Sequence, residues 1–318
     1  MKELFDLHMR EDSNLIVSVF MLAYNHEKYI AQAIDSILFQ QRNFKLEIVI
    51  GEDCSTDSTR FILNNYKEKY PGIIKLLLHE RNVGASNNHK MTMAACSGKY
   101  IAVCEGDDYW TDPLKLQKQV DFLENNPEYS LCCHRVHYLK EKEQAMISWG
   151  DNYFGEGQSS REITIDNIFD PFLIITVSVC CRADAFNHRE ISTLKDYKDI
   201  FMFALSLKRG KGICFNEFMA VYRIHETGIW SMQSGLNNLK ANVYTSISIA
   251  KYFRMQNDYL NRFAYDQCVN YLRQLEMWPY KEDYREVLKY LYYHLAITFW
   301  RRDTVGKKLG YLLKYFQS

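Results

Sequence analysis

Three acidic residues, Glu105, Asp107 and Asp108, lie within four positions of one another, directly after an apolar run. Carboxylates this close repel one another unless a cation neutralises them. Oxygen ligands at the end of a strand suit a hard divalent ion such as Mg²⁺ or Mn²⁺, which keeps several waters and takes further ligands from phosphates. The alternative is a solvated acidic turn before the next helix. We favour a metal and phosphate site centred on residues 105–110.

A further carboxylate, Asp53, ends a second apolar run. Burying a carboxylate there is costly without a hydrogen-bond donor, and a pyrimidine ring N–H or a ribose hydroxyl would supply one. The alternative is that Asp53 belongs, with Ser55 and Asp57, to the turn and N-cap of the following helix. We favour ligand binding for Asp53 and a capping role for the other two.

The first 130 residues alternate short apolar runs with helical periodicity, which is typical of βαβ units. The expected strands are residues 15–22, 46–50, 73–78 and 100–104. Right-handed connections make these strands parallel, so their carboxyl ends share the edge where open α/β sheets bind ligands. Each strand is followed there by polar residues: Tyr24 and Asn25, Glu52 and Asp53, residues 82–84, and residues 105–108.

The intervening and later elements are less regular. Helices are expected to follow the first three strands, and Asp112 with Pro113 favours the start of another that runs to about residue 124. Residues 141–161 read as an irregular insertion. Residues 199–209 are helical, and residues 213–215 and 220–225 read as strand-like. Beyond residue 237 the chain predicts several helices rich in aromatic and apolar residues.

Composition excludes several classes of protein. Lys and Arg number 39, as do Asp and Glu, so no overall field favours nucleic acid and any charged ligand must be held locally. The nine Cys include no Cys-x-x-Cys pair, which favours reduced, buried thiols. Residues 1–14 lack the apolar core of a secretory signal, and the longest apolar run, 171–181, is about half of a membrane span. The sequence predicts a soluble, cytoplasmic protein.

Four segments together resemble family 2 glycosyltransferases in order and spacing: residues 20–25, 51–59, 81–84 and 99–110. The resemblance extends over residues 15–123, with weaker matches to His225. It implies a GT-A (Rossmann-like) α/β fold, a nucleotide-diphosphate-sugar donor, a divalent cation (Mn²⁺ or Mg²⁺) and inversion at the anomeric carbon. The implied domains are an N-terminal extension (1–14), a GT-A domain (15–235) with a nucleotide-sugar half (15–130) and an acceptor half (131–235), and a helical region (236–318).

The resemblance also implies roles for single residues on the donor side. Tyr24 and Asp53 match positions that hold the donor base, and Asn25 lies beside them. Glu52 matches the first carboxylate of the usual Asp-Asp pair. Gly84 and Asn88 match the loop near the ribose and diphosphate. Glu105 and Asp107 stand in the first and last places of the Asp-x-Asp motif, so Asp107 is the metal-ligand candidate, while Glu105 could reach the ribose or a metal-bound water.

On the acceptor side, residues 198–203 resemble the helix start that supplies the catalytic base. The spacing favours Asp199, with Asp196 as the second choice; the alternative is a structural Asp in the first turn of a helix. Residues 222–225 resemble the family's Tyr-Arg-x-His segment. There His225 would complete the metal site or meet the diphosphate, and Arg223 would donate to a phosphate. Asp108 and Trp110 are supporting candidates, and His26 is a weaker one.

The function implied is transfer of a sugar, with UDP as the favoured nucleotide, to a glycan or lipid-linked acceptor in surface polysaccharide synthesis. A sugar-phosphate nucleotidylyltransferase is the first alternative, although residues 23–29 lack the Gly-rich loop it requires. A non-catalytic binding module derived from a transferase is the second. Residues 301–314 predict a basic amphipathic helix that could contact the inner face of a membrane peripherally; a solvated helix face is the alternative.

Overall fold

A computed structural model of the chain describes residues 16–150, 153–170, 173–194, 197–226, 228, 235–254 and 256–276. The chain divides into two compact units, Met1–Gly228 and Ile229–Ser318, and each is treated separately. The expected N-terminal extension, the expected basic helix at residues 301–314, and Asp196 lie outside the described residues.

A single sheet of ten strands forms the first unit, in the order β3-β2-β1-β4-β9-β6-β10-β5, with β7 beside β6 and β8 beside β10. The expected nucleotide-sugar half (15–130), called the donor half below, contributes β1 (Ile16–Ala23), β2 (Lys45–Glu52), β3 (Ile74–Leu78), β4 (Tyr100–Val103) and β5 (Tyr109–Trp110). The remaining strands are β6 (Tyr129–Lys140), β7 (Ala145–Ser148), β8 (Ser160–Ile163), β9 (Cys180–Arg182) and β10 (Lys211–Ile224). The neighbouring pairs among β1 to β4 are parallel, so their carboxyl ends share one edge, as the sequence predicts.

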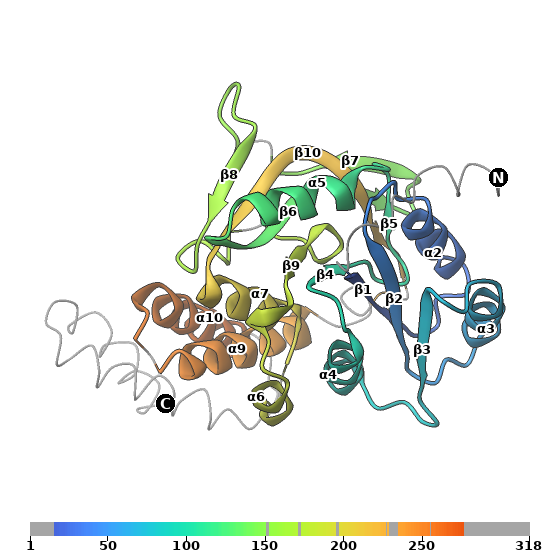
Figure 1. Cartoon of the computed structure of the whole chain (residues 1–318). Helices are drawn as coiled ribbons and strands as arrows, with labels where there is room; N and C mark the ends of the chain where they lie inside the picture. The colour runs from blue at the N-terminus through green and yellow to red at the C-terminus, as the bar shows by residue number, and fades with distance from the viewer. Residues whose placement is uncertain are drawn as a thin grey trace, which may run out of the picture. The chain divides into compact units, whose positions relative to one another are not determined.

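Helices cover the donor half of the sheet on both faces (Figure 1). They are α2 (Ile30–Leu38), α3 (Thr59–Lys69), α4 (Ala85–Ala95) and, before the acceptor half, α5 (Lys115–Asn125). The buried residues of α2 are the apolar set that its 3.6-residue period predicts: Ile30, Ala33, Ile34, Ile37 and Leu38. Short helix α6 (His188–Thr193) and helix α7 (Asp199–Arg209) follow, and α7 packs against β6 and β10.

The acceptor half is more regular than the sequence predicts. The expected insertion at residues 141–161 contains β7 and the start of β8, and two expected strand segments are one strand, β10. β10 shifts register against β6 between Phe215 and Phe218 and again before Ala220. A β-bulge places an extra residue in a strand and interrupts the alternation of buried and exposed side chains, so the sequence pattern appears broken where the strand continues.

The start of α5 also differs from expectation. The helix begins at Lys115, two residues beyond Pro113, and its N-cap position is Leu114. The Asp112 side chain still accepts a hydrogen bond from the Leu114 N–H at 2.8 Å. Asp112 therefore contacts the helix start from two positions before the N-cap residue.

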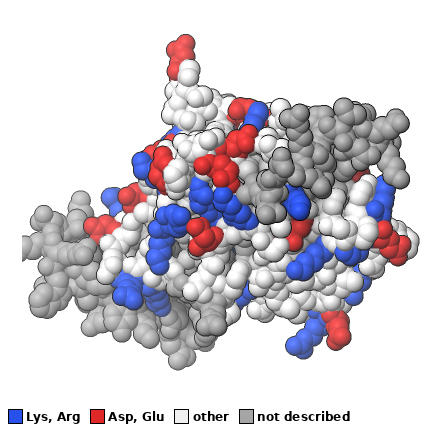
Figure 2. Space-filling model, in the orientation of Figure 1, with Lys and Arg blue, Asp and Glu red and all other residues white. Residues whose placement is uncertain are grey.

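The second unit contains α9 (Gly235–Tyr252) and α10 (Asp258–Glu276), which pack together. Their shared core consists of Val243, Ile247, Ala250, Ala264, Cys268 and Tyr271. Among the described helices, none is long and apolar enough to span a membrane. All nine cysteines are free thiols, and seven of them are buried. Acidic and basic side chains lie beside one another on the face in Figure 2, in keeping with the balanced charge.

Candidate functional site

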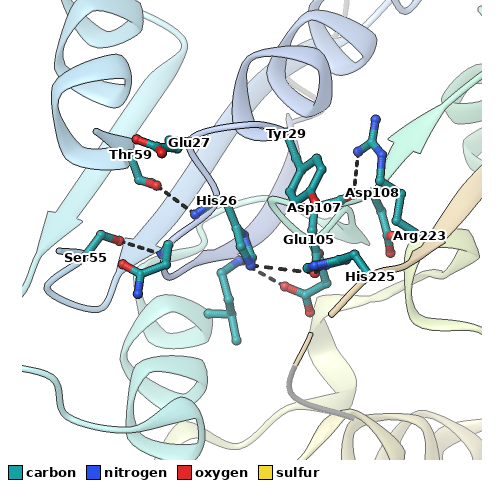
Figure 3. A network of polar contacts seen from close by, with 12 residues as sticks. His26, Glu27, Tyr29, Ser55, Thr59, Glu105, Asp107, Asp108, Arg223 and His225 are labelled. Atoms are coloured by element: carbon teal, nitrogen blue, oxygen red, sulfur yellow. Dashed lines mark hydrogen bonds and ion pairs between the residues drawn. The ribbon is translucent and has the colours of Figure 1, made fainter. Parts of the chain in front are cut away.

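The carboxylate of Asp107 lies between two histidines that come from distant parts of the chain (Figure 3). Its Oδ2 atom is 3.0 Å from Nε2 of His225, which follows β10, and 3.6 Å from Nε2 of His26, which follows β1. Burial alone would raise the pKa of Asp107, but the hydrogen bond with His225 and the charge of His26 outweigh it and lower that pKa. Asp107 is therefore held as a carboxylate at the end of the parallel strands.

The other two acidic residues of the stretch are in different surroundings. Glu105 accepts a hydrogen bond from the Leu22 N–H at 3.2 Å, and burial together with the nearby charge of Asp107 raises its pKa to about 8. Asp108 is almost fully buried and accepts the Arg223 N–H at 2.8 Å. Burial and the charge of Asp107 raise the pKa of Asp108 well above its usual range.

A divalent cation fits this distribution of charge. The pKa values of Glu105 and Asp108 are raised first by burial and then by the negative charge of Asp107, and a bound cation would offset both effects. Within the described part of the chain, no three His, Cys, Asp or Glu side chains are grouped as a ready metal site. Asp107 keeps 21% of its side chain exposed. One carboxylate completed by substrate phosphates and waters is a common way to hold Mg²⁺, and Asp107 can serve in that way.

Arg223 supports the Asp107 loop from inside the protein. Its guanidinium donates to the Asp107 carbonyl and to the Gln32 side chain. The same group lies over two aromatic rings, 5.0 Å from the Tyr29 centroid and 4.7 Å from that of Tyr109. Arg223 is buried, and these two hydrogen bonds join the loop that carries Asp107 to Gln32 on α2.

Asp53 joins the end of β2 to the loop before α4. Its two oxygens accept the backbone N–H groups of Val83 at 2.7 Å and Gly84 at 3.1 Å. Gly84 has φ 83° and ψ 150°, a conformation that is essentially restricted to glycine. The hydrogen-bond donors to the Asp53 carboxylate therefore come from the protein backbone, which the sequence does not predict. The carboxylate fixes the shape of the loop before α4, where the nucleotide is expected to bind.

Two further donor-side candidates are fully engaged with the framework. Glu52 is buried, forms an ion pair with Arg60 and accepts the Ser55 N–H at 2.5 Å. Asn88 is buried as well; its amide donates to the Gly51 carbonyl at 2.9 Å, and its oxygen lies 2.9 Å from Nε2 of His79. Both side chains fix the loops at the carboxyl edge of the sheet.

Tyr24 and Asn25 lie on the solvent side of these loops. Tyr24 is exposed, which leaves its ring accessible to a ligand. Asn25 has a positive φ of 56°, a conformation that Asn tolerates better than most residues. Its backbone N–H donates to the Ser55 hydroxyl at 3.0 Å, and its side-chain oxygen accepts the Thr56 N–H at 2.8 Å. Asn25 therefore ties the loop after β1 to the loop after β2.

Asp199 is the first residue of α7, where the sequence predicts a helix start. One carboxylate oxygen accepts the Thr176 hydroxyl at 2.9 Å, and the other accepts the Ile200 N–H at 2.8 Å. After burial and the charge of Asp107, the charge of Asp199 also raises the pKa of Glu105. Asp199 thus lies within electrostatic reach of the acidic stretch, although 94 residues separate it from Glu105 in the sequence.

Trp110 lies in the core beneath the acidic stretch. Its indole N–H donates to the Val177 carbonyl at 2.9 Å, and the Lys115 ammonium lies 4.1 Å from the ring centroid. These contacts support the loop of residues 105–108 and leave Trp110 buried.

Two residues near Asp107 carry little signal in the sequence. His26 was a weak candidate, and its only signal was its place beside Tyr24 and Asn25. Tyr29 is not a candidate from the sequence, because an aromatic residue at the start of an apolar helix is typical of the hydrophobic core. Its ring lies 4.8 Å from that of His225, and its hydroxyl donates to Glu141 at 2.5 Å.

Comparison with known families gives a match to the family model described as "Glycosyl transferase family 2" over residues 18–185. An uncharacterized protein of Mycobacterium tuberculosis is 35% identical over 67% of this chain, and the chain spans 60% of that relative's length. The putative teichuronic acid biosynthesis glycosyltransferase TuaG of Bacillus subtilis is 28% identical, over 68% of this chain and 82% of TuaG.

Two solved structures share the architecture. TarS of S. aureus, in complex with UDP-GlcNAc, superposes with a TM-score of 0.63 at 14% identity, over 88% of this chain and 81% of that structure. The mannosyltransferase PcManGT of Pyrobaculum calidifontis, in complex with GDP-Man and Mn²⁺, gives a TM-score of 0.55 at 12% identity, over 95% of this chain and 79% of that structure. At these identities the likeness concerns the fold alone, and the predicted GT-A fold is confirmed.

Proposed function

The chain belongs to glycosyl transferase family 2, and from that premise we propose that it transfers a sugar from a nucleotide-diphosphate-sugar to a hydroxyl group of a glycan or lipid-linked acceptor. The observation that carries the proposal is the meeting of Asp107, His26 and His225 at the carboxyl edge of the parallel strands, within electrostatic reach of Asp199. We propose UDP as the nucleotide and surface polysaccharide as the product. The UDP-GlcNAc bound by TarS supports the first, and the teichuronic acid biosynthesis for which TuaG is named supports the second.

The donor nucleotide is proposed to lie along the loops after β1, β2 and β3. Tyr24 offers an exposed ring against which a base can stack. Asp53 and Gly84 shape the adjoining loop through the two hydrogen bonds between carboxylate and backbone. Glu52, Asn25 and Asn88 would act by holding these loops in place, because their side chains are committed to neighbouring residues.

Asp107 is proposed to hold Mn²⁺ or Mg²⁺ together with the donor diphosphate, and PcManGT with its Mn²⁺ supports this choice of ions. When bound, such an ion supplies positive charge that stabilises the leaving diphosphate. His225 and His26 would keep the Asp107 carboxylate ionised and oriented from either side. Arg223 would fix the backbone of the same loop through the Asp107 carbonyl.

Asp199 is proposed as the base that takes the proton of the acceptor hydroxyl, which then displaces the nucleotide in one step with inversion. The Thr176 hydroxyl donates to one oxygen of this carboxylate, which would hold the side chain in a single orientation. The start of α7 also places this carboxylate at the positive end of the helix dipole. Asp196 remains the second choice and lies outside the described residues.

Nucleotide release from UDP-sugars and GDP-mannose in the presence of Mn²⁺ tests this assignment. We expect Asp107→Ala and Asp199→Asn each to lower turnover about 100-fold or more. Asp184→Asn is the matched control, because Asp184 is exposed and its partner is the surface residue Arg209; it should keep full activity. Turnover that neither site substitution changes would contradict the mechanism. Nucleotide binding without any turnover of the native chain would indicate a binding module instead.

A further inference from the structure

Three aromatic rings form a row across neighbouring strands of the sheet, with a half-exposed ring at one end, a buried ring in the middle and a half-buried ring at the other end. Trp149 follows β7, and its ring centroid is 4.6 Å from that of Tyr138 on β6, with the planes inclined at 42°. Tyr138 in turn lies 5.8 Å from Tyr222 on β10. Trp149 is 38% exposed, whereas Tyr138 is buried. The outer ring is therefore supported from behind by a fixed partner and keeps part of its surface in water.

The inner end of the row adjoins the acidic stretch. Tyr222 directly precedes Arg223, whose backbone N–H donates to Asp108 at 2.8 Å. The residue before it, Val221, pairs with Tyr109 of β5, so this part of β10 runs beside the loop that carries Asp107. Burial raises the pKa of Tyr222, and the charges of Asp108, Asp107 and Asp199 raise it further. Tyr222 is therefore within electrostatic reach of both the proposed metal ligand and the proposed base.

We propose that the exposed face of Trp149 is a stacking platform for a pyranose ring of the acceptor, one sugar removed from the ring that carries the reacting hydroxyl. This inference rests on the proposed glycosyl transfer. A pyranose ring has a face of C–H groups and a rim of hydroxyls. The negative face of an indole attracts the C–H groups, and the hydroxyls can stay in water. The row from Trp149 through Tyr138 to Tyr222 leads from this platform to the carboxylates.

Among the described residues, three other aromatic side chains are exposed. Tyr24 follows β1 and belongs to the proposed nucleotide-binding loops. Phe39 follows α2, and Phe61 lies on α3, both in the donor half of the sheet. Trp149 is distinguished from them by its continuity with the carboxylate cluster. The support from Tyr138 also restricts the rotation of the indole, so stacking on it costs less conformational entropy than stacking on a free side chain.

Saturation-transfer NMR on the full chain, with UDP and Mn²⁺ present, tests the platform. The probes are four disaccharides, namely cellobiose, maltose, lactose and N,N′-diacetylchitobiose. We expect at least one to bind the native chain, Trp149→Ala to weaken that binding by about 3- to 10-fold, and Trp149→Phe to retain part of it. Phe61→Ala is the control, because it removes an aromatic ring that is even more exposed, 69% against 38% for Trp149, from α3; it should bind as the native chain does.

Two readouts separate this inference from the proposed function. The affinity for UDP, followed by thermal shift, should be the same in the native chain, Trp149→Ala and Phe61→Ala, so a failure of donor binding would be visible independently. No disaccharide signal from the native chain, or equal signals from the native chain and Trp149→Ala, would overturn the platform. It would also be overturned if Trp149→Ala reduced binding only to phosphatidylglycerol vesicles, which would assign the ring to a lipid surface.

Discussion

At the residue scale, Arg223 holds the loop of the acidic stretch through contacts within the protein. Its guanidinium donates to the Asp107 carbonyl and to Gln32 between the rings of Tyr29 and Tyr109. Lysine cannot reproduce this planar, forked geometry. We therefore expect Arg223→Lys to lower the free energy of unfolding without ligand by about 2 kcal/mol or more, measured by urea denaturation.

An arginine at the surface provides the control for this prediction. Arg209→Lys is the control, since Arg209 pairs with Asp184 at the surface, where such an ion pair contributes about 0–1 kcal/mol. If Arg223 instead binds the diphosphate, Arg223→Lys would leave the unliganded stability unchanged and weaken only UDP binding. That outcome would restore the phosphate role expected from the sequence.

Lys115 provides a pH-dependent prediction at the same scale. It is fully buried, donates to Gln119 at 2.7 Å, and burial lowers its pKa from 10.5 to about 8. Between these two values the unfolded chain binds more protons than the folded one, so stability should rise with pH. At about 1.4 kcal/mol for each unit of pKa difference, we expect native stability to gain up to roughly 3 kcal/mol relative to Lys115→Met between about pH 8 and 10.5. Urea unfolding of both proteins at several pH values measures this, and parallel curves would contradict it.

The sequence predicts which residues lie at the site better than it predicts the contacts that they make. Asp53 and Asp107 each follow a strand, and they are predicted to lie at one edge of the sheet because the carboxyl ends of parallel strands share that edge. The pairing of Asp53 with the N–H groups of residues 83 and 84 depends on how the loop folds back, which no periodicity encodes. The approach of His26 and His225 to one carboxylate likewise joins segments 199 residues apart.

At the scale of elements, the loop between β3 and α4 depends on a single glycine. Gly84 has φ 83° and ψ 150°, and a Cβ added there would meet no atom within 4 Å. The cost of Gly84→Ala is therefore conformational rather than steric, about 1–3 kcal/mol. Because the Gly84 N–H is one of the two donors to Asp53, we expect weaker UDP binding as well, measured by calorimetry alongside urea unfolding.

Gly72 offers a matched control in the same half of the sheet. A Cβ at Gly72 would also have open space, but its φ lies outside the positive range. Gly72→Ala should be neutral or stabilising by about 0.4–1 kcal/mol, because it reduces the entropy of the unfolded chain. Equal effects of the two substitutions would show that the conformation of Gly84 does not limit the loop.

The elements themselves were predictable where one signal dominated. β1 to β4 and α2 follow from apolar runs and a 3.6-residue period that tertiary contacts reinforce. The sequence predicts two segments in place of β10, because the register shifts around Phe218 break the alternation of buried and exposed side chains within one strand. β7 was missed because its residues are alternately half-buried and exposed, so its strand character depends on pairing with β6 rather than on burial.

At the scale of the whole molecule, balanced charge means that nucleotide binding must depend on local contacts. A ligand that binds only the folded state at 100 times its dissociation constant adds about 2.7 kcal/mol of stability, which raises the melting temperature of a unit of this size by roughly 5–10 °C. We expect this shift for the full chain with UDP and Mn²⁺, measured by scanning calorimetry. EDTA in place of Mn²⁺ should remove part of it.

Substitutions of Asp107 and Asp199 should have different effects on this shift in melting temperature. Asp199→Asn should keep the whole shift, because the proposed base contacts the acceptor and not the nucleotide, whereas Asp107→Ala should lose the part that depends on Mn²⁺. The chain divides into two units, and the site residues all lie in Met1–Gly228. If the units unfold in separate transitions, the ligand should move only one of them. A Mn²⁺-dependent shift that survives Asp107→Ala would place the cation away from Asp107 and require another ligand for the diphosphate.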